Sequence, residues 1–357
     1  MHHFIFPTID SWISSGSNKV TGVTEADQNF GQDQILEIKK FFYNSSFDYP
    51  TRALISFTGQ EFTNVSQSIV DGDIVEPEFY LRLYEAEGNQ ELSTEYKLLA
   101  QPISQSWDEG IGKFGDSPKV TDGVSWDNRN NKTGNSAVTW SVGNGNQAYG
   151  GVVHDVSHSV QTFSYESPDI EIDITDMAKG WLSGSQEGGF DNNGILLRFS
   201  GSQETDSVTF GQLKFFSKDT HTIYAPKLEV RWDDHLPCTG DNTGSLIQLT
   251  VDGGTDNYLY MKNLQESYKE SDKVKFRVGA RKQYIQKNFS TSVQTTSGSF
   301  IPEDSGSYSI VDMATGETVI PFSDYTKLSC DSTSNYFIQW LNGFYPDRAY
   351  KILFKLK

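Results

Sequence analysis

The sequence predicts an all-β protein made of two β-sandwich domains, and three observations carry that prediction. Aromatic residues are abundant, with 17 Tyr, 23 Phe and 7 Trp, and such side chains favour the pleated surface of a sheet. The 31 Gly residues, together with many Asn, Asp and Ser, form clusters that are typical of turns. Apolar runs between these clusters are short, and long helical patterns are absent. A length of 357 residues is enough for two domains that each bury a core.

The charge is unevenly distributed along the chain, and the step in charge indicates a domain boundary. Residues 1–238 contain 16 Lys and Arg against 34 Asp and Glu, whereas residues 239–357 contain 13 of each, so the net charge of −18 belongs to the first segment. A cluster of turn residues follows an apolar run at positions 232–244. We therefore predict one domain over residues 1–236 and a second over residues 243–357. The acidic surface of the first repels phosphate backbones, which argues against nucleic acid as a partner.

The first domain contains short runs that have the pattern of sandwich strands. They are apolar or alternate in polarity, turn residues bound them, and they cover residues 52–57, 79–84, 194–199 and 227–232. Residues 175–182 are the one convincing helix, with Thr175 expected as its N-cap and an acidic residue in the first turn. We expect Trp181 of this helix to fill one end of the sandwich.

The second domain has the pattern of a smaller, Ig-like β-sandwich. Its alternating runs cover residues 258–261, 273–278, 308–311, 318–322, 336–340 and 350–354. The basic residues Arg277, Arg281, Lys282 and Lys287 form its positive patch. We predict that this patch is an interface with an acidic neighbour, which includes the first domain of another copy of the chain. A solvated strand face is the alternative.

Acidic residues gather between positions 108 and 127. Asp108, Glu109, Asp116, Asp122 and Asp127 offer oxygen ligands, and Ca²⁺ takes six to eight of them, so we predict a calcium site at these residues. A solvated acidic loop is the alternative, because the spacing matches no EF-hand. Asp108 and Glu109 are adjacent, so on a strand they would point to opposite faces and could not together form the facing carboxyl pair of a glycosidase, although another acid could partner either one. No other cofactor is predicted.

The sequence motifs of several other protein classes are missing. The sequence has no nucleophile elbow and no phosphate-binding Gly-Lys-Ser/Thr loop, and His154 and His158 lack the Glu of a zincin motif. Pro7 interrupts the first apolar run, no basic leader precedes it, and no run is long enough for a membrane span. Cys238 and Cys330 are too few for a disulfide framework, which favours two thiols in a reducing cytosol. We expect a non-enzymatic protein without a membrane partner.

Nine short segments of the first domain occur in an order that is typical of a known family. They are residues 10–13 (DSWI), 29–31 (NFG), 52–57 (RALISF), 80–84 (YLRLY), 106–110 (SWDEG), 138–140 (VTW), 172–175 (IDIT) with Trp181, 193–197 (NGILL) and 226–230 (PKLEV). In the order and the sequence of these segments, residues 8–232 resemble the DNRLRE-type β-sandwich domain, which is also classed among carbohydrate-binding modules. The resemblance implies a jelly-roll-like sandwich.

An acidic domain of this kind followed by an Ig-like β module resembles virion structural proteins of marine T4-like tailed phages. The resemblance implies a component of the particle in the tail, baseplate, neck or head decoration. Such a protein is made in the host cytoplasm and acts through contacts with other virion proteins and with copies of itself. The alternative is a carbohydrate-binding module that contacts polysaccharide on a cell surface, and an exposed pair of aromatic rings would be its mark. A lyase or hydrolase is a weaker alternative, because no segment remains for a separate catalytic domain.

Overall fold

The computed structural model describes residues 1–17, 22–43, 46–87, 96–132, 134–155, 158–163, 169–184, 188–251, 256–284, 289 and 298–357. The chain is predominantly β, with 40% strand and 11% helix, several antiparallel sheets and a curled half-barrel sheet near the C-terminus. In these ranges, no helix has the length and apolar character needed to cross a membrane.

Contacts divide the chain into two compact units. The N-terminal unit consists of Ile5–Asp73 and Glu78–Val230, and the C-terminal unit consists of Met1–Phe4, Ile74–Pro77 and Arg231–Lys357. The first four residues of the sequence therefore belong with its last third. The domain limits predicted from the charge step stay a prediction.

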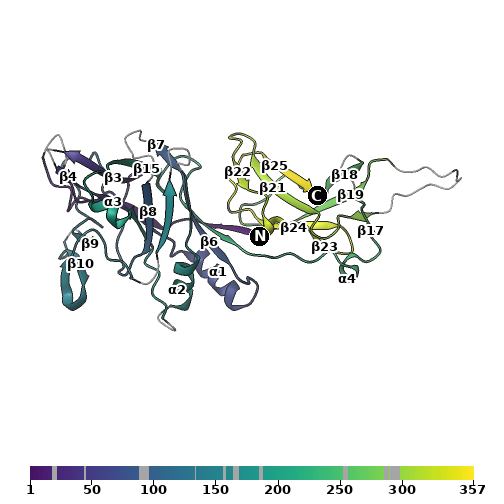
Figure 1. Ribbon diagram of the computed structural model, residues 1–357, viewed down its shortest axis with the longest axis horizontal. Helices are drawn as coiled ribbons and strands as arrows, with labels where there is room; N and C mark the ends of the chain where they lie inside the picture. The colour runs from purple at the N-terminus through teal and green to yellow at the C-terminus, as the bar shows by residue number, and fades with distance from the viewer. Residues whose placement is uncertain are drawn as a thin grey trace. The chain divides into compact units, whose positions relative to one another are not determined.

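The strands of the N-terminal unit form several sheets (Figure 1). The strands are β1 (His2–Ile5, of which Ile5 belongs to this unit), β2 (Ile9–Ser14), β3 (Ile35–Tyr43), β4 (Ser46–Asp48), β5 (Thr51–Ser56), β6 (Glu78–Leu83), β7 (Glu85–Glu87), β8 (Tyr96–Pro102), β9 (Asn128–Asn130), β10 (Val138–Val142), β11 (Asn146–Ala148), β12 (Ser159–Phe163), β13 (Ile170–Asp173), β14 (Ile195–Phe199), β15 (Gly211–Phe216) and β16 (Lys227–Arg231). Within this unit their orders are β12-β8-β14-β5-β2, β16-β6-β13, β4-β3-β15-β7 and β11-β10-β9.

Alternation along these strands explains how they pack. In β6, Phe79, Leu81 and Leu83 are fully buried while the residues between them are half-buried, as expected for a strand with one face on a core. The four runs predicted as strands are confirmed as β5, β6, β14 and β16.

The helices of the N-terminal unit are α1 (Gln60–Val70), α2 (Thr175–Ser183) and α3 (Gly201–Thr205), with a 3-10 turn at Gly143–Gly145. The predicted helix α2 is confirmed, but the predicted cap is wrong: Ile174 is the N-cap, and Thr175 is the first helical residue. The Thr175 hydroxyl instead accepts a hydrogen bond from the Phe79 N–H at 2.9 Å, which ties α2 to β6. Trp181 is buried and packs edge-on against Phe62 of α1, a helix that the sequence analysis missed.

The described residues of the C-terminal unit form two sheets and short helical turns. Its elements are α4 (Gly240–Thr243), β17 (Ile247–Gln248), β18 (Asn257–Lys262), β19 (Lys273–Lys282), β20 (Ser299–Phe300), β21 (Gly306–Asp312), β22 (Thr318–Ile320), a 3-10 turn (Asp324–Thr326), β23 (Ser329–Cys330), β24 (Asn335–Trp340) and β25 (Tyr350–Leu356). The larger sheet has the order β17-β20-β19-β24-β23, with β18 also paired to β19, and the smaller has the order β22-β21-β25. The β17–β20 pair is parallel.

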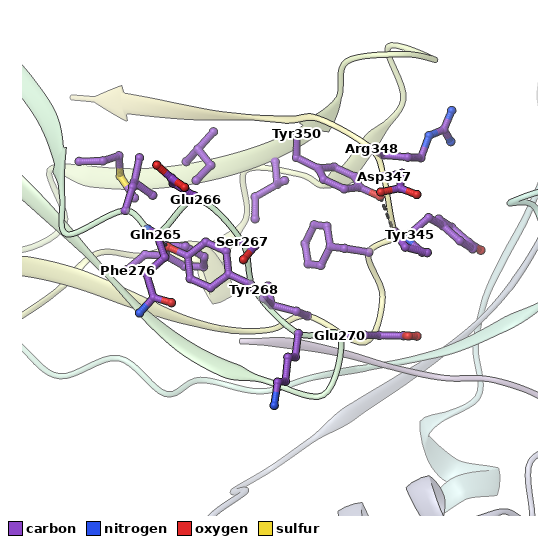
Figure 2. Close-up of a pocket in the computed structure, with 18 residues that line it drawn as sticks. Gln265, Glu266, Ser267, Tyr268, Glu270, Phe276, Tyr345, Asp347, Arg348 and Tyr350 are labelled. Carbon is purple, nitrogen blue, oxygen red and sulfur yellow. Dashed lines mark hydrogen bonds between the residues drawn. The ribbon is translucent and has the colours of Figure 1, made fainter.

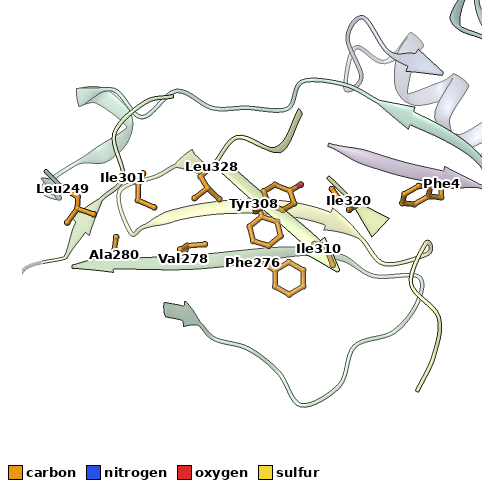
Figure 3. Packing of buried hydrophobic residues seen from close by; sticks show 11 residues of the cluster. Phe4, Leu249, Phe276, Val278, Ala280, Ile301, Tyr308, Ile310, Ile320 and Leu328 are labelled. Carbon is orange, nitrogen blue, oxygen red and sulfur yellow. The ribbon is translucent and has the colours of Figure 1, made fainter. Parts of the chain in front are cut away.

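The core of the C-terminal unit is built around stacked aromatic rings (Figure 3). Phe337 stacks on Tyr308 with ring centroids 4.0 Å apart and on Phe276 at 5.2 Å. Phe4 belongs to the same buried cluster, and Asn342 donates a hydrogen bond to its carbonyl oxygen at 2.6 Å. The first residues of the chain therefore complete this core.

Candidate functional site

The side chain of Asn29 holds the acidic loop at residues 108–127 in place. Asn29 is fully buried, and its Nδ2 donates to the carbonyl oxygens of Glu109 at 2.6 Å and Val124 at 2.8 Å. Gly110 passes so close that a Cβ there would lie 2.4 Å from Asn29 Oδ1, and its φ of +86° also favours glycine. This packing fixes the position of the Glu109 backbone.

Glu109 lies in a group of three carboxylates with Asp10 and Asp219, whose oxygens are within 4.8 Å of one another. Glu109 Oε1 accepts from the Asp10 N–H at 3.0 Å and forms an ion pair with Lys218 Nζ at 3.0 Å. Lys218 Nζ also lies 3.0 Å from Asp219 Oδ1, and the Lys218 N–H donates to Asp10 Oδ2 at 2.6 Å. The ammonium group of Lys218 therefore supplies a cation to this group.

Burial controls the electrostatics of these side chains. It raises the pKa of Asp10 to about 8, so this carboxyl is protonated at neutral pH, and it also raises the pKa of Glu109. Burial by itself lowers the pKa of Lys218, but hydrogen bonds to Asp219 and Glu109 outweigh that effect and raise it. The arrangement joins β2, the acidic loop and residues 217–219 through charge and hydrogen bonds.

Of the five acids predicted to bind calcium, only Glu109 belongs to a group of three or more close carboxylates in the part of the chain that the structure describes. The other four have separate contacts: Asp108 pairs with Lys132 at 3.1 Å, Asp116 Oδ2 accepts from the Lys113 N–H at 2.7 Å, the Asp122 carbonyl accepts from the Ile111 N–H at 3.4 Å, and the Asp127 N–H donates to the Ala26 carbonyl at 3.0 Å. The calcium site stays a prediction.

A second group of charged residues lies on the larger sheet of the C-terminal unit. Tyr258 pairs with Arg281, and Lys273 pairs with Trp340, across β18, β19 and β24. Paired residues share one side of an antiparallel sheet, and the alternate residues of β19, such as Val278, point to the core. The residues on the outer side, which we call the basic aromatic face, are Tyr258, Tyr260, Lys262, Lys273, Lys275, Arg277, Arg281, Tyr336, Ile338 and Trp340.

The cations of the basic aromatic face lie over its rings. Arg281 is 4.6 Å from the Tyr258 ring centroid, Lys275 is 3.5 Å from Tyr336, Lys273 is 5.2 Å from Trp340 and Lys262 is 6.0 Å from Tyr260. Asp331 pairs with Lys275 and with Arg277, each at 2.9 Å. Burial by itself would raise the pKa of Asp331, but its hydrogen bonds from Arg277 and Lys275 hold that pKa well below its usual range. The face keeps an excess of positive charge.

Two tyrosines are the exposed aromatic residues of this face. Tyr258 and Tyr260 are 46% and 38% exposed, and their ring centroids are 5.8 Å apart with an angle of 25° between the ring planes. Tyr260 covers Gly279, where a Cβ would lie 2.4 Å from the ring carbon Cζ. Glycine at position 279 therefore makes room for the ring against the sheet.

The four basic residues predicted to form one positive patch do not share one face of the sheet. Arg277 and Arg281 lie on the basic aromatic face. Lys282 is paired with Asn257 on the other side of β19, and its Nζ donates to the Thr250 carbonyl at 3.2 Å. Lys287 lies outside the described residues. Lys262, Lys273 and Lys275 were not among the residues predicted for the positive patch, although the alternate spacing of 273, 275 and 277 places two of these lysines on the face of Arg277.

No protein-family model matches the chain, and neither a curated protein nor a solved structure matches it. The resemblance to the DNRLRE-type domain therefore rests on the nine sequence segments alone.

Proposed function

We propose that this chain is a non-enzymatic binding protein of a tailed-phage particle, in which the basic aromatic face docks on an acidic neighbouring subunit. The observation that carries the proposal is the gathering of five cations on one sheet face where, among the residues that the structure describes, Asp331 is the one carboxylate paired with them. In this proposal the N-terminal unit is a DNRLRE-like jelly-roll sandwich, the C-terminal unit is an Ig-like sandwich, and the protein resides in the virion after synthesis in the host cytoplasm.

Charge complementarity favours a second copy of the chain as the neighbour. Residues 1–238 have a net charge of −18, so the N-terminal unit of one copy attracts the basic aromatic face of another. Because the cations already lie over tyrosine and tryptophan rings, they lose less side-chain freedom when a partner binds.

Sedimentation velocity tests this proposal at low and high salt. We expect the wild-type chain to associate at low ionic strength and to dissociate as salt screens the contact. The double variant Lys273→Glu, Arg281→Glu should stay monomeric, whereas Lys282→Glu, on the other side of the same strand, should associate like the wild type. A wild-type chain that stays monomeric at every salt concentration, or equal behaviour of the two variants, contradicts self-docking.

Placement in the particle requires a second experiment. Cryo-microscopy of the source virion should reveal residues of both units ordered against other chains in a symmetric array. If purified virions lack the chain, the assignment to a phage particle is wrong. Self-docking through the basic aromatic face would then be tested by sedimentation velocity only.

The second candidate function is glycan binding, and the exposed pair Tyr258 and Tyr260 favours it. Aromatic rings present a flat apolar surface on which the CH face of a sugar can stack. Affinity electrophoresis with alginate, pectin and peptidoglycan fragments tests this candidate. Gly279→Ala displaces Tyr260 and crowds Cε of Lys262 at 2.8 Å but removes no charge, so it should abolish retardation by a glycan and weaken self-association less than the charge-reversing double variant does. No reducing ends or unsaturated products should appear in the same mixtures.

A further inference from the structure

A pocket of about 790 Å³ opens in the C-terminal unit between two connecting segments (Figure 2). Residues 264–270, which join β18 to β19, form one wall, and residues 341–348, which join β24 to β25, form the other. Phe276 and Ile310 of the core line it from the sheet side. This pocket has no part in the basic aromatic face.

Aromatic rings line the pocket in two edge-to-face pairs. Tyr268 meets Phe276 with ring centroids 5.6 Å apart and 62° between the planes, and Phe344 meets Tyr350 at 4.8 Å and 87°. In an edge-to-face pair, one ring keeps an electron-rich face that is free of its partner. The walls therefore offer aromatic faces to a ligand.

Both tyrosines are fixed by hydrogen bonds from their own connecting segments. The Tyr268 hydroxyl oxygen accepts from the Gln265 N–H at 2.9 Å, and the Tyr350 hydroxyl oxygen accepts from the Tyr345 N–H at 2.8 Å. Rings held in this way lose little freedom on binding, so the pocket is organised before a ligand enters.

The charges around the pocket are unbalanced toward the negative. Glu266, Glu270 and Asp347 line it, and none has an ion-pair partner among the described residues. The guanidinium of Arg348 is already paired with the buried carboxylate of Asp312 at 3.0 Å. Lys269 remains as the other cation of the lining, against three carboxylates.

We propose that this pocket binds an alkylammonium group, seated against the rings of Tyr268 and Tyr350 and attracted by Glu270 and Asp347. The quadrupole of an aromatic ring attracts a cation over its face, and nearby carboxylates add Coulomb attraction. Quaternary ammonium headgroups and lysine side chains share this chemistry. The proposal does not depend on self-docking or on a phage particle.

Comparing the binding of choline with that of its uncharged isostere 3,3-dimethylbutan-1-ol separates the contribution of the positive charge from that of the ligand's shape. We expect choline to bind about tenfold more tightly to the full chain, because only choline carries the cation. In ¹H NMR titrations its N-methyl resonance should move upfield, since the ring currents act on protons above an aromatic face. Saturation of the protein should transfer to the same protons.

Charge-removing variants locate the site. The double variant Glu270→Gln, Asp347→Asn should weaken choline about five- to tenfold, since it removes two carboxylates from the lining. Asn tolerates the φ of +58° at position 347, so the fold should persist. Asp241→Asn removes an exposed carboxylate of the same unit that does not line the pocket, and it should leave choline binding unchanged.

Two further ligands test which molecule supplies the alkylammonium group and whether the pocket binds a sugar instead. Nα-acetyl-lysine methylamide should bind as well. Tighter binding of this compound than of choline would identify a lysine side chain as the better ligand, and tighter binding of choline would identify a quaternary ammonium headgroup. Equal affinity for choline and its uncharged isostere would overturn the proposal. So would binding of methyl glucoside without binding of choline, or choline binding that the double variant leaves intact.

Discussion

The backbone N–H of Asp10 donates to Oε1 of Glu109 at 3.0 Å, across 99 residues of sequence. Asp10 is buried in the same place, with only 1% of the residue exposed. This hydrogen bond joins the edge strand β2 to the acidic loop, at a place where protein surrounds the carboxyl of Asp10.

The stability of the N-terminal unit should fall as pH rises from about 4 to 8. Burial raises the pKa of Asp10 to about 8 in the folded state, while an unfolded Asp has a pKa of about 3.9. Between these values the folded chain keeps a proton that the unfolded chain has lost, so each pH unit lowers the free energy of unfolding by up to about 1.4 kcal/mol. Urea denaturation of Asp10→Asn should have a shallower pH dependence and greater stability at pH 8. Asp73→Asn, an exposed control, should keep the wild-type slope, and a slope unchanged in Asp10→Asn refutes the prediction.

Replacing Lys218 should create a response to calcium. Lys218→Gln leaves Asp219 and Glu109 without their ammonium partner, so the melting temperature should fall. Millimolar Ca²⁺ should restore part of the loss, because carboxylate oxygens are its preferred ligands, and EDTA should reverse the effect. The wild-type chain in the same titration tests the calcium site predicted for the acidic loop. Stabilisation by calcium supports that site, and an unchanged melting temperature contradicts it.

Glu204→Gln should destabilise the N-terminal unit by about 2–4 kcal/mol. Arg52 Nε and Nη2 contact the two oxygens of Glu204 at 2.8 and 2.9 Å, and Arg198 Nη1 lies 2.7 Å from Oε2. Glu204 is buried, so its loss leaves two guanidinium groups poorly compensated. Glu87→Gln removes an exposed partner of Lys214 and should cost less than about 1 kcal/mol. Equal losses in chemical denaturation would show that burial does not strengthen the network.

Phe4→Ala should destabilise the C-terminal unit by about 3–4 kcal/mol, because it leaves a cavity in the core that Phe337 and Tyr308 share. Phe6→Ala, in the neighbouring residues of the other unit, should leave that transition in place. Calorimetry that resolves the two unfolding transitions provides the measurement. A fragment of residues 231–357 should likewise be less stable than the same fragment supplemented with residues 1–4, and equal stability would argue against a structural role of Phe4.

Strand prediction succeeded where alternation is strong and local. β6 buries every second residue, so its pattern is visible in the sequence. Helix α1 was missed because only Phe62 and Val65 are buried among polar neighbours. The wrong cap at Thr175 has a tertiary cause, since its hydroxyl is committed to Phe79 on another element.

Site prediction was weaker because it grouped residues by their position in the chain. Successive strand residues point to opposite faces, so Arg281 and Lys282 could not share one surface. The face that contains Arg281 also contains Lys262, which lies on a different strand. Only the register of β18 against β19 places these two residues on the same face.

Composition and periodicity by themselves determined the β character of this protein, the positions of many strands and the concentration of acid in the first 238 residues. These properties depend on neighbours in sequence, which a single chain displays directly. Only the tertiary structure decided that Phe4 completes a core with Phe337, that Asp10 and Lys218 join Glu109, and that Tyr268 and Tyr350 line one pocket. Such long-range contacts depend on strand register and on the packing of side chains that are distant in sequence. The sequence around a residue does not indicate which distant residue will bury it.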